Sequence, residues 1–128
     1  MNIKLVYLVV PNLLQMVESP ISWNDFEKIE LRVGTIIKVE EFPEARKPAY
    51  KLFIDLGELG VKKSSAQITN LYNQDDLIGK QVICVCNFPE KQIGPFRSEV
   101  LTTGFADANN NVILATTDKS TPNGARLF

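Results

Sequence analysis

The sequence predicts an all-β domain that closes into a barrel, and three observations support this fold class. Short runs of alternating apolar and polar residues dominate the chain after residue 30. Turn-forming residues separate these runs at short intervals, as is typical of all-β domains. One short helical pattern, within residues 70–78, falls between the third and fourth runs. Together these features predict a five-stranded OB-fold barrel with short helices and terminal extensions.

A short helix is expected before the first strand, at residues 22–29. Ser22 and Asp25 have the spacing of a capping box, in which two side chains satisfy free backbone donors at a helix start. Trp23, Phe26 and Ile29 fall on one face of this helix. We therefore expect these three side chains in the core.

The strands follow in order along the chain. The first is expected at residues 30–42, where Gly34 indicates a bulge or a tight bend. Its alternating residues are expected to share one face: Leu31, Val33, Thr35, Ile37 and Val39. The second strand, residues 50–57, places Leu52, Ile54 and Leu56 on one side. Further strands are expected at residues 61–68, 81–88, 98–105 and 112–117, with a polar turn at 109–111.

The composition argues against an enzyme. The chain has no histidine, which removes the commonest general base and metal ligand. Cys84 and Cys86 are its two cysteines, too few for a disulfide framework, which favours a reduced, cytoplasmic compartment. Both side chains point the same way on one strand, and we expect them in the core rather than at a metal. We expect no catalytic residue, no metal and no cofactor.

The first residues form a separate apolar segment. Residues 1–17 are largely apolar but interrupted by Pro11, and the run is too short for a membrane span. Three interpretations remain open: an ordered extension over an apolar surface, an export signal, or an extension upstream of a start at Met16. No clear small-x-small cleavage site follows the run, and of the three interpretations we favour the ordered extension. The expected organisation is an N-terminal apolar extension, 1–20, and one domain, 21–128.

Cations gather where an OB barrel binds its ligands, on the second and third strands and the loops beside them. The whole chain has a net charge of −1, so a claim of nucleic-acid binding depends on local patches. Residues 46–63 carry five cations and two anions, a local net charge of +3. The cations expected at this surface are Arg46, Lys47, Lys51, Lys62 and Lys63, joined by Lys91 and Arg97 from the loop before the fifth strand. Such a patch is what phosphate binding requires.

Aromatic residues are interleaved with these cations, and exposed rings can stack on unpaired bases. The rings are Phe42, Tyr50, Phe53, Phe88 and Phe96. Large aromatics are usually buried, so most of these are expected in the core. Tyr50 and Phe96, at loop edges, are the better candidates for stacking.

Four segments carry a resemblance to a known family. They are FEKIELRVGTI (26–36), EFPEARKPAYKLFIDLGELGVKKSSAQIT (41–69), LIGKQVICVCNFP (77–89) and IGPFRSEVLTTGFADANNNVIL (93–114). In this order they resemble the CsaA-type tRNA-binding domain, which is also similar to the C-terminal appendix of methionyl-tRNA synthetases. The resemblance covers about residues 21–125.

The resemblance implies a non-catalytic OB-fold protein that forms a homodimer, binds tRNA and does not bind a membrane. It also implies an alternative function, an export-related chaperone that binds unfolded or preprotein polypeptides. The family positions carried over are Lys63, Ser64, Ser65, Ile68, Asn87, Arg97, Ser98 and Glu99. Lys63 and Arg97 can contact phosphates, while Ser65, Asn87 and Ser98 can form hydrogen bonds with sugar or phosphate oxygens. Glu99 is expected to hold Arg97 or Lys63 in place, or to accept a hydrogen bond from a base.

Overall fold

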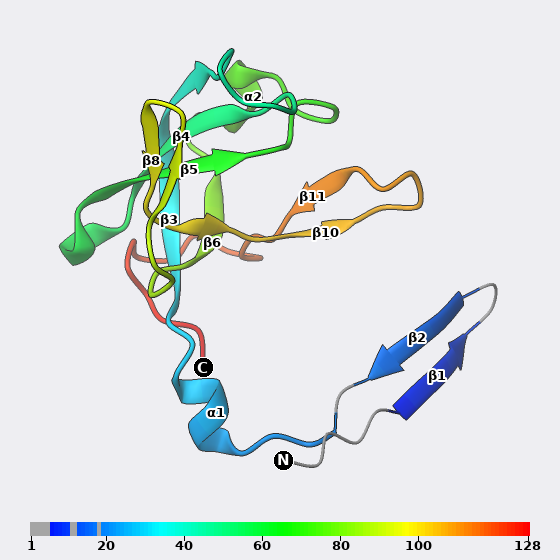
Figure 1. Ribbon diagram of the computed structural model, residues 1–128. Helices are drawn as coiled ribbons and strands as arrows, with labels where there is room; N and C mark the ends of the chain where they lie inside the picture. The colour runs from blue at the N-terminus through cyan, green and yellow to red at the C-terminus, as the bar shows by residue number, and fades with distance from the viewer. Residues whose placement is uncertain (1–5, 11–12, 18) are drawn as a thin grey trace.

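The computed structural model describes residues 6–10, 13–17 and 19–128, with side chains from residue 19 onward. Five strands form the main sheet, in the order β5-β4-β3-β6-β9. Their bounds are β3 Leu31–Glu41, β4 Tyr50–Asp55, β5 Val61–Ala66, β6 Gln81–Val85 and β9 Leu101–Thr102. The sheet curls so that β5 approaches β9, which gives a nearly closed barrel (Figure 1). The predicted OB-fold-like barrel is confirmed.

Short elements connect or flank these strands. The helix α2, Gln74–Leu77, lies between β5 and β6, as the sequence predicts. Two hairpins leave the barrel, one formed by β7 and β8 and the other by β10 and β11. The remaining bounds are β1 Val6–Val10, β2 Leu13–Val17, α1 Trp23–Glu27, η1 Gly57–Leu59, β7 Lys91–Ile93, β8 Phe96–Ser98, β10 Gly104–Ala106 and β11 Val112–Leu114.

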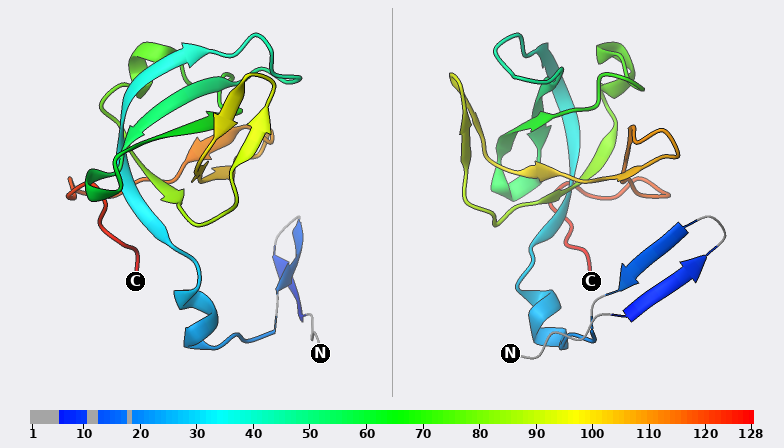
Figure 2. Two further views of the ribbon diagram at one scale, coloured as in Figure 1. Left: turned by 60° about the vertical axis from the view of Figure 1, so that its left-hand side comes forward. Right: turned by 45° about the vertical axis from the view of Figure 1, so that its right-hand side comes forward.

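The predicted strand at 98–105 is wrong as one continuous strand. The chain forms three short strands instead, because successive segments pair with different partners. β8 pairs with β7, β9 pairs with β6, and β10 pairs with β11. This division carries the chain from an outer hairpin, through the barrel wall, into a second hairpin (Figure 2).

The barrel core comes from the predicted alternation. Leu52, Ile54 and Leu56 are fully buried, as expected, and pack with Ile36 and Leu77. The first strand departs from its predicted pattern because a bulge lies between Ile36 and Lys38. An extra residue in one strand reverses which side chains face inward. Ile37 is therefore about half exposed, whereas Ile36 is buried.

Gly34 does not form this bulge, which lies three residues further along. Its role is close packing: a Cβ there would lie 2.7 Å from Cδ2 of Leu56 and closer still to Ile54. Those two side chains belong to the centre of the core. Gly34 thus lets the backbone of β3 approach these two side chains closely.

The capping box of α1 is confirmed, but the predicted burial of its apolar face is wrong. Ser22 Oγ accepts a hydrogen bond from the Asp25 N–H, and Asp25 accepts one from the Ser22 N–H. Trp23 is 63% exposed and Ile29 is 44% exposed. The reason is position: α1 lies beyond the end of β3 and outside the barrel (Figure 1). No helix among the described residues is long and apolar enough to cross a membrane.

The two ends of the chain differ in how they join the barrel. The C-terminal tail runs antiparallel to the start of β3, where the Leu127 N–H donates to the Leu31 carbonyl and the Val33 N–H donates to the Ala125 carbonyl. The N-terminal strands β1 and β2 pair only with each other among the described residues. The predicted extension at 1–20 thus contains a hairpin, although residues 1–5, 11, 12 and 18 lie outside the described residues. Its separation from the 21–128 domain stays a prediction.

Candidate nucleic-acid interface

The outer face of β3, β4 and β5 is the centre of the candidate interface. Because residues opposite each other across paired strands share a face, the register defines two rows of outward side chains. One row runs Lys38–Phe53–Lys63, and the other runs Glu40–Lys51–Ser65. Two of the predicted cations, Lys51 and Lys63, therefore stand on one surface with Ser65.

A small aromatic cluster lies on this outer face, separate from the barrel core. Phe96 of the β7–β8 hairpin packs edge-on against Phe42, with 5.3 Å between ring centroids, and contacts Phe53 at 6.4 Å. Phe42 and Phe96 are both buried, together with Ala49. Edge-to-face pairs of this kind stabilise the aromatic packing. They fix the β7–β8 hairpin against the outer face of the sheet.

Three lysines surround this aromatic cluster. The Lys51 ammonium lies 5.1 Å from the Phe42 ring centroid, and the Lys63 ammonium lies 5.4 Å from that of Phe96. Lys38 lies 5.0 Å from the Phe53 centroid and also 3.7 Å from Glu40. Cation–π contacts hold an ammonium over a ring while leaving its N–H donors available. Among the described residues, Lys51 and Lys63 form no ion pair.

The remaining predicted cations lie around the face at different distances from its centre. Arg46 and Lys47 are exposed in the β3–β4 loop, and Lys91 is exposed on β7. Lys62 differs, because it pairs with the inward residue Ile54 and so points away from the Lys51 face. It lines a hollow with three carboxylates, those of Glu30, Glu90 and Glu99. We therefore do not include Lys62 in the proposed surface.

Ser64 was predicted to contact RNA, but the structure contradicts this prediction. It is fully buried, and its hydroxyl accepts a 2.8 Å hydrogen bond from Thr102 Oγ1. Ser64 lies opposite Leu52, so the alternation of β5 turns it inward. Ile68, the other buried family position, is 4% exposed and belongs to the core. Lys63 and Ser65, on the opposite face, keep partial exposure.

Ser98 and Glu99 accept hydrogen bonds from the backbone of β5. The sequence analysis expected that Glu99 would hold Arg97 or Lys63 in place, but it did not expect the bond to Ser98. Ser98 Oγ accepts from the Ser65 N–H at 3.0 Å, and Glu99 Oε1 accepts from the Lys63 N–H at 3.0 Å. The Glu99 N–H in turn donates to the Lys63 carbonyl at 2.7 Å. These bonds satisfy the free edge of β5 and close the barrel. Glu99 thus holds Lys63 through its backbone.

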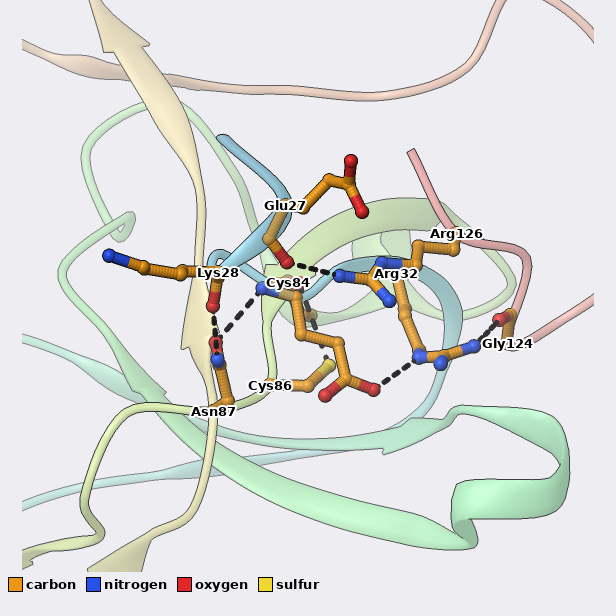
Figure 3. A network of polar contacts seen from close by, with 9 residues as sticks. Glu27, Lys28, Arg32, Cys84, Cys86, Asn87, Gly124 and Arg126 are labelled. Carbon is orange, nitrogen blue, oxygen red and sulfur yellow. Dashed lines mark hydrogen bonds and ion pairs between the residues drawn. The ribbon is translucent and has the colours of Figure 1, made fainter. Parts of the chain in front are cut away.

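Asn87 uses both ends of its amide within the protein. Its Oδ1 accepts from the Glu30 N–H at 2.9 Å, and its Nδ2 donates to the Lys28 carbonyl at 2.6 Å. Figure 3 shows this pair of bonds beside Arg32, which contacts Glu30 and the Gly124 carbonyl. Asn87 therefore fixes the turn between α1 and β3. This network supports the fold at the end of the barrel.

Arg97 lies at the surface but is held by neighbours on its own hairpin. Its Nη1 lies 2.9 Å from Glu90, and its Nε donates to Gln92 at 3.2 Å. The side chain remains more than half exposed. Its ion pair with Glu90 reduces the charge available to a phosphate, in contrast to Lys51 and Lys63.

The predicted stacking residues are wrong, and another ring is available. Tyr50 is 7% exposed and Phe96 is 6% exposed. The Tyr50 hydroxyl donates to the Tyr72 carbonyl at 2.9 Å, and burial raises the pKa of Tyr50. Phe88, just after β6, is 56% exposed and lines a cavity of about 410 Å³ with Ser65. The sequence analysis placed Phe88 at the end of an expected strand, 81–88, but β6 ends at Val85, so Phe88 lies outside the sheet.

The two cysteines fit their predicted place in or against the core. Cys84 is fully buried, and Cys86 packs against the same cluster. Burial raises the pKa of the Cys84 thiol to about 12, so it stays protonated at neutral pH. Burial also raises the pKa of Cys86. Among the described residues, no group of three histidine, cysteine or acidic side chains is placed to hold a metal ion.

Comparison with known proteins identifies the family. Residues 31–126 match the family described as Putative tRNA binding domain, so the chain belongs to the tRNA-binding domain family. The chain is 35% identical over 101 residues to the methionine–tRNA ligase of Methanocaldococcus jannaschii, covering 79% of this chain and 15% of that protein. It is 34% identical over 108 residues to methionine–tRNA ligase 1 of Bacillus cereus, covering 84% and 16%. The chain therefore spans about 15% of the length of these ligases.

Two solved structures resemble the chain over their whole length, and both are CsaA chaperones. The protein from Picrophilus torridus is 50% identical and that from Bacillus anthracis is 46% identical, each with a TM-score of 0.80. They cover 85% and 86% of this chain, and the chain covers 100% of each. The resemblance to the CsaA type is confirmed.

Proposed function

We propose that the protein binds tRNA through the outer face of β3–β5, without catalysing a reaction. The observation that carries this proposal is the set of lysines held over the aromatic cluster, because Lys51 and Lys63 present unpaired charge from a rigid surface. Phosphate contacts of this kind position a nucleic acid without reading its sequence. Such a protein works where tRNA is found, in the cytoplasm.

We call the outer face of β3–β5 the lysine face, because Lys38, Lys51 and Lys63 stand on it. The interface also includes residues at the edges of this face. Arg46, Lys47 and Lys91 extend the positive surface along both neighbouring loops. Ser65 and Ser98 offer hydroxyls to sugar or phosphate oxygens, although each already contributes to barrel closure. Phe88 is placed to stack on an unpaired base. Arg97 and Glu99 mainly hold this surface in shape, whereas Asn87 holds the turn between α1 and β3.

A salt series tests the tRNA proposal. Total tRNA is titrated with the purified protein at several salt concentrations, because phosphate binding releases counterions and weakens as salt rises. Lys63→Ala should reduce the slope of log affinity against log salt by roughly 0.7 to 0.9, the value for one lost phosphate contact. Arg97→Ala should reduce the slope less, since Glu90 already pairs with Arg97. Lys119→Ala, an exposed lysine in the loop after β11, is the matched control.

We further propose that the protein is a homodimer formed through the apolar surface at the barrel's end. Trp23, Phe26 and Ile29 of the α1 region line a hollow of about 290 Å³ with Leu127 and Phe128. Phe128 is fully exposed, and exposed apolar groups of this kind favour association. A second copy would bury the same surface on both partners.

Sedimentation analysis tests the dimer with a matched pair of variants. Trp23→Ser should give monomers, whereas Phe105→Ser should leave dimers intact. Phe105 is 70% exposed but lies on β10, away from the hollow. Dimers that persist in Trp23→Ser would place the contact elsewhere on the molecule.

Chaperone activity is the second candidate function, because the two CsaA chaperone structures match 85% and 86% of this chain. Polypeptide binding should depend weakly on salt, since it buries apolar surface. A light-scattering assay with an unfolded substrate tests this function directly. If the protein does not slow aggregation, and an unfolded polypeptide does not displace tRNA, the tRNA proposal stands alone.

A further inference from the structure

A polar cavity lies beside the lysine face, and its amide side chains belong to none of the sites described above. Its volume is about 370 Å³, within the range of small-ligand sites. Three segments form it: the β3–β4 loop, the residues after β5, and the β10–β11 hairpin with its turn. The predicted site residues include Lys47 from this lining.

The lining of this cavity is rich in side-chain amides. They come from Gln67, Asn70, Asn110 and Asn111. Asn70 Nδ2 donates to Asn111 Oδ1 at 3.0 Å, which ties two of the walls together. This bond leaves the other ends of both amides available, and within the described chain Gln67 and Asn110 form no side-chain hydrogen bond. The cavity therefore presents both donors and acceptors.

The charge and apolar surface of the cavity also suit a nucleotide. Lys47 is its one charged lining residue among those described, so no carboxylate there repels a phosphate. Leu71 and Val112 supply apolar surface against which a flat base can pack. Amide side chains recognise bases through paired hydrogen bonds, and adenine is their usual partner.

The cavity is continuous with the proposed interface. Gln67 lines both this cavity, which we call the amide cavity, and the neighbouring hollow of about 410 Å³. That hollow contains Phe88, Ser65 and Lys91. A single strand can therefore pass from the exposed ring of Phe88, along the outer edge of β5, to the amides.

We propose that the amide cavity binds one unpaired nucleotide of the RNA, with its base against the amides and its phosphate near Lys47. This inference rests on the proposed tRNA binding and adds base selectivity to it. The lysine face contacts phosphates of any sequence, whereas the amide cavity favours adenine.

Fluorescence anisotropy with four labelled single-stranded RNA hexamers, each of one base, tests the proposal at fixed salt. The adenine hexamer should bind tightest. Gln67→Ala and Asn111→Ala should weaken binding of that hexamer by about three- to tenfold, the effect of losing one or two hydrogen bonds, and should bring the four affinities together. Asn109→Ala is the matched control: it is an exposed asparagine in the same turn, outside the cavity lining.

The outcomes separate this proposal from the general function. Equal affinity for all four hexamers in the unaltered protein would overturn the amide cavity, while salt-dependent tRNA binding would still support the lysine face. The proposed nucleotide site is also overturned if Gln67→Ala and Asn111→Ala bind the adenine hexamer as tightly as Asn109→Ala does. Lys63→Ala should lower the affinity for all four hexamers by the same factor, because its contact is with phosphate.

Discussion

The two faces of β4 and β5 are built from alternate residues of the same short strands, yet they have opposite chemistry. The inner face carries Leu52, Ile54 and Ser64, each with no exposed surface. The outer face carries Lys51 and Lys63 over aromatic rings. The difference shows how a strand period of two lets one segment supply both the barrel core and a binding surface.

The comparison also explains why the outer face can hold charge rigidly. On most exposed strands lysines move freely in solvent, but here the β7–β8 hairpin places Phe96 beneath two of them. The outer face therefore has a small core of its own, formed with Phe42 and Ala49. Substitutions on the inner face should therefore mainly change stability, whereas substitutions of the lysines on the outer face should mainly change tRNA binding.

The largest expected effect comes from the inner face. Ile54→Ala should lower the unfolding free energy by roughly 2 to 5 kcal/mol, the usual cost of truncating a buried isoleucine. Its neighbour Phe53→Ala should cost less, because Phe53 is partly exposed and packs only on the outer face. Urea unfolding followed by circular dichroism measures both. Equal losses for the two variants would break the distinction between the faces.

The sequence predicted the inner face well for a physical reason. Leu52, Ile54 and Leu56 alternate without interruption, so the period alone identified their shared burial. The bulge at Ile37 could not be predicted in this way, since no local residue marked the extra position in β3. The exposure of Trp23 could not be predicted locally either. A helical face is buried only if another part of the chain packs against it, and α1 lies outside the barrel.

A second, smaller effect concerns pH. The thiol of Cys84 has a pKa of about 12 when folded and an ordinary value of 9.0, so ionisation above pH 9 favours the unfolded chain. Stability from this group is complete below pH 9 and is lost as the pH rises toward 12. The loss between pH 8 and pH 10 should be on the order of 1 kcal/mol.

Denaturant unfolding at both pH values measures the alkaline effect. Cys84→Ala removes the titrating thiol and should flatten this part of the pH dependence, whatever its effect on absolute stability. Cys86→Ala is the comparison on the same strand end, where the thiol is only half-buried. A slope that is unchanged in Cys84→Ala would assign the alkaline loss to other groups.

A third effect tests the inward position of Ser64. Ser64→Ala removes the acceptor for Thr102 Oγ1 and should cost about 1 kcal/mol, the typical net value of one hydrogen bond. Because the hydroxyl is buried, tRNA affinity should not change. A loss of tRNA affinity without a loss of stability would return Ser64 to the interface.

The site was harder to predict than the core. Charge counting selected Lys51 and Lys63, which share the outer face, but it did not separate them from Lys62, which points the other way along β5. It also missed Lys38, which the bulge in β3 rotates onto the outer face. Roles for Asn87 and Glu99 depend on backbone partners far away in sequence, and no local pattern shows those partners.

The smallest expected effect on stability belongs to the outer lysines. Lys51→Ala and Lys63→Ala remove the cation–π contacts that these two partly exposed lysines make with buried rings, and each substitution should cost about 0.5 to 1 kcal/mol. Their tRNA affinity should fall far more clearly, whereas a mild core variant such as Ile54→Val should bind normally while folded. Measuring unfolding and tRNA binding on the same three preparations tests both halves of the comparison. If Ile54→Val weakened binding as much as Lys63→Ala did, the outer face would depend on barrel shape rather than on its own charges.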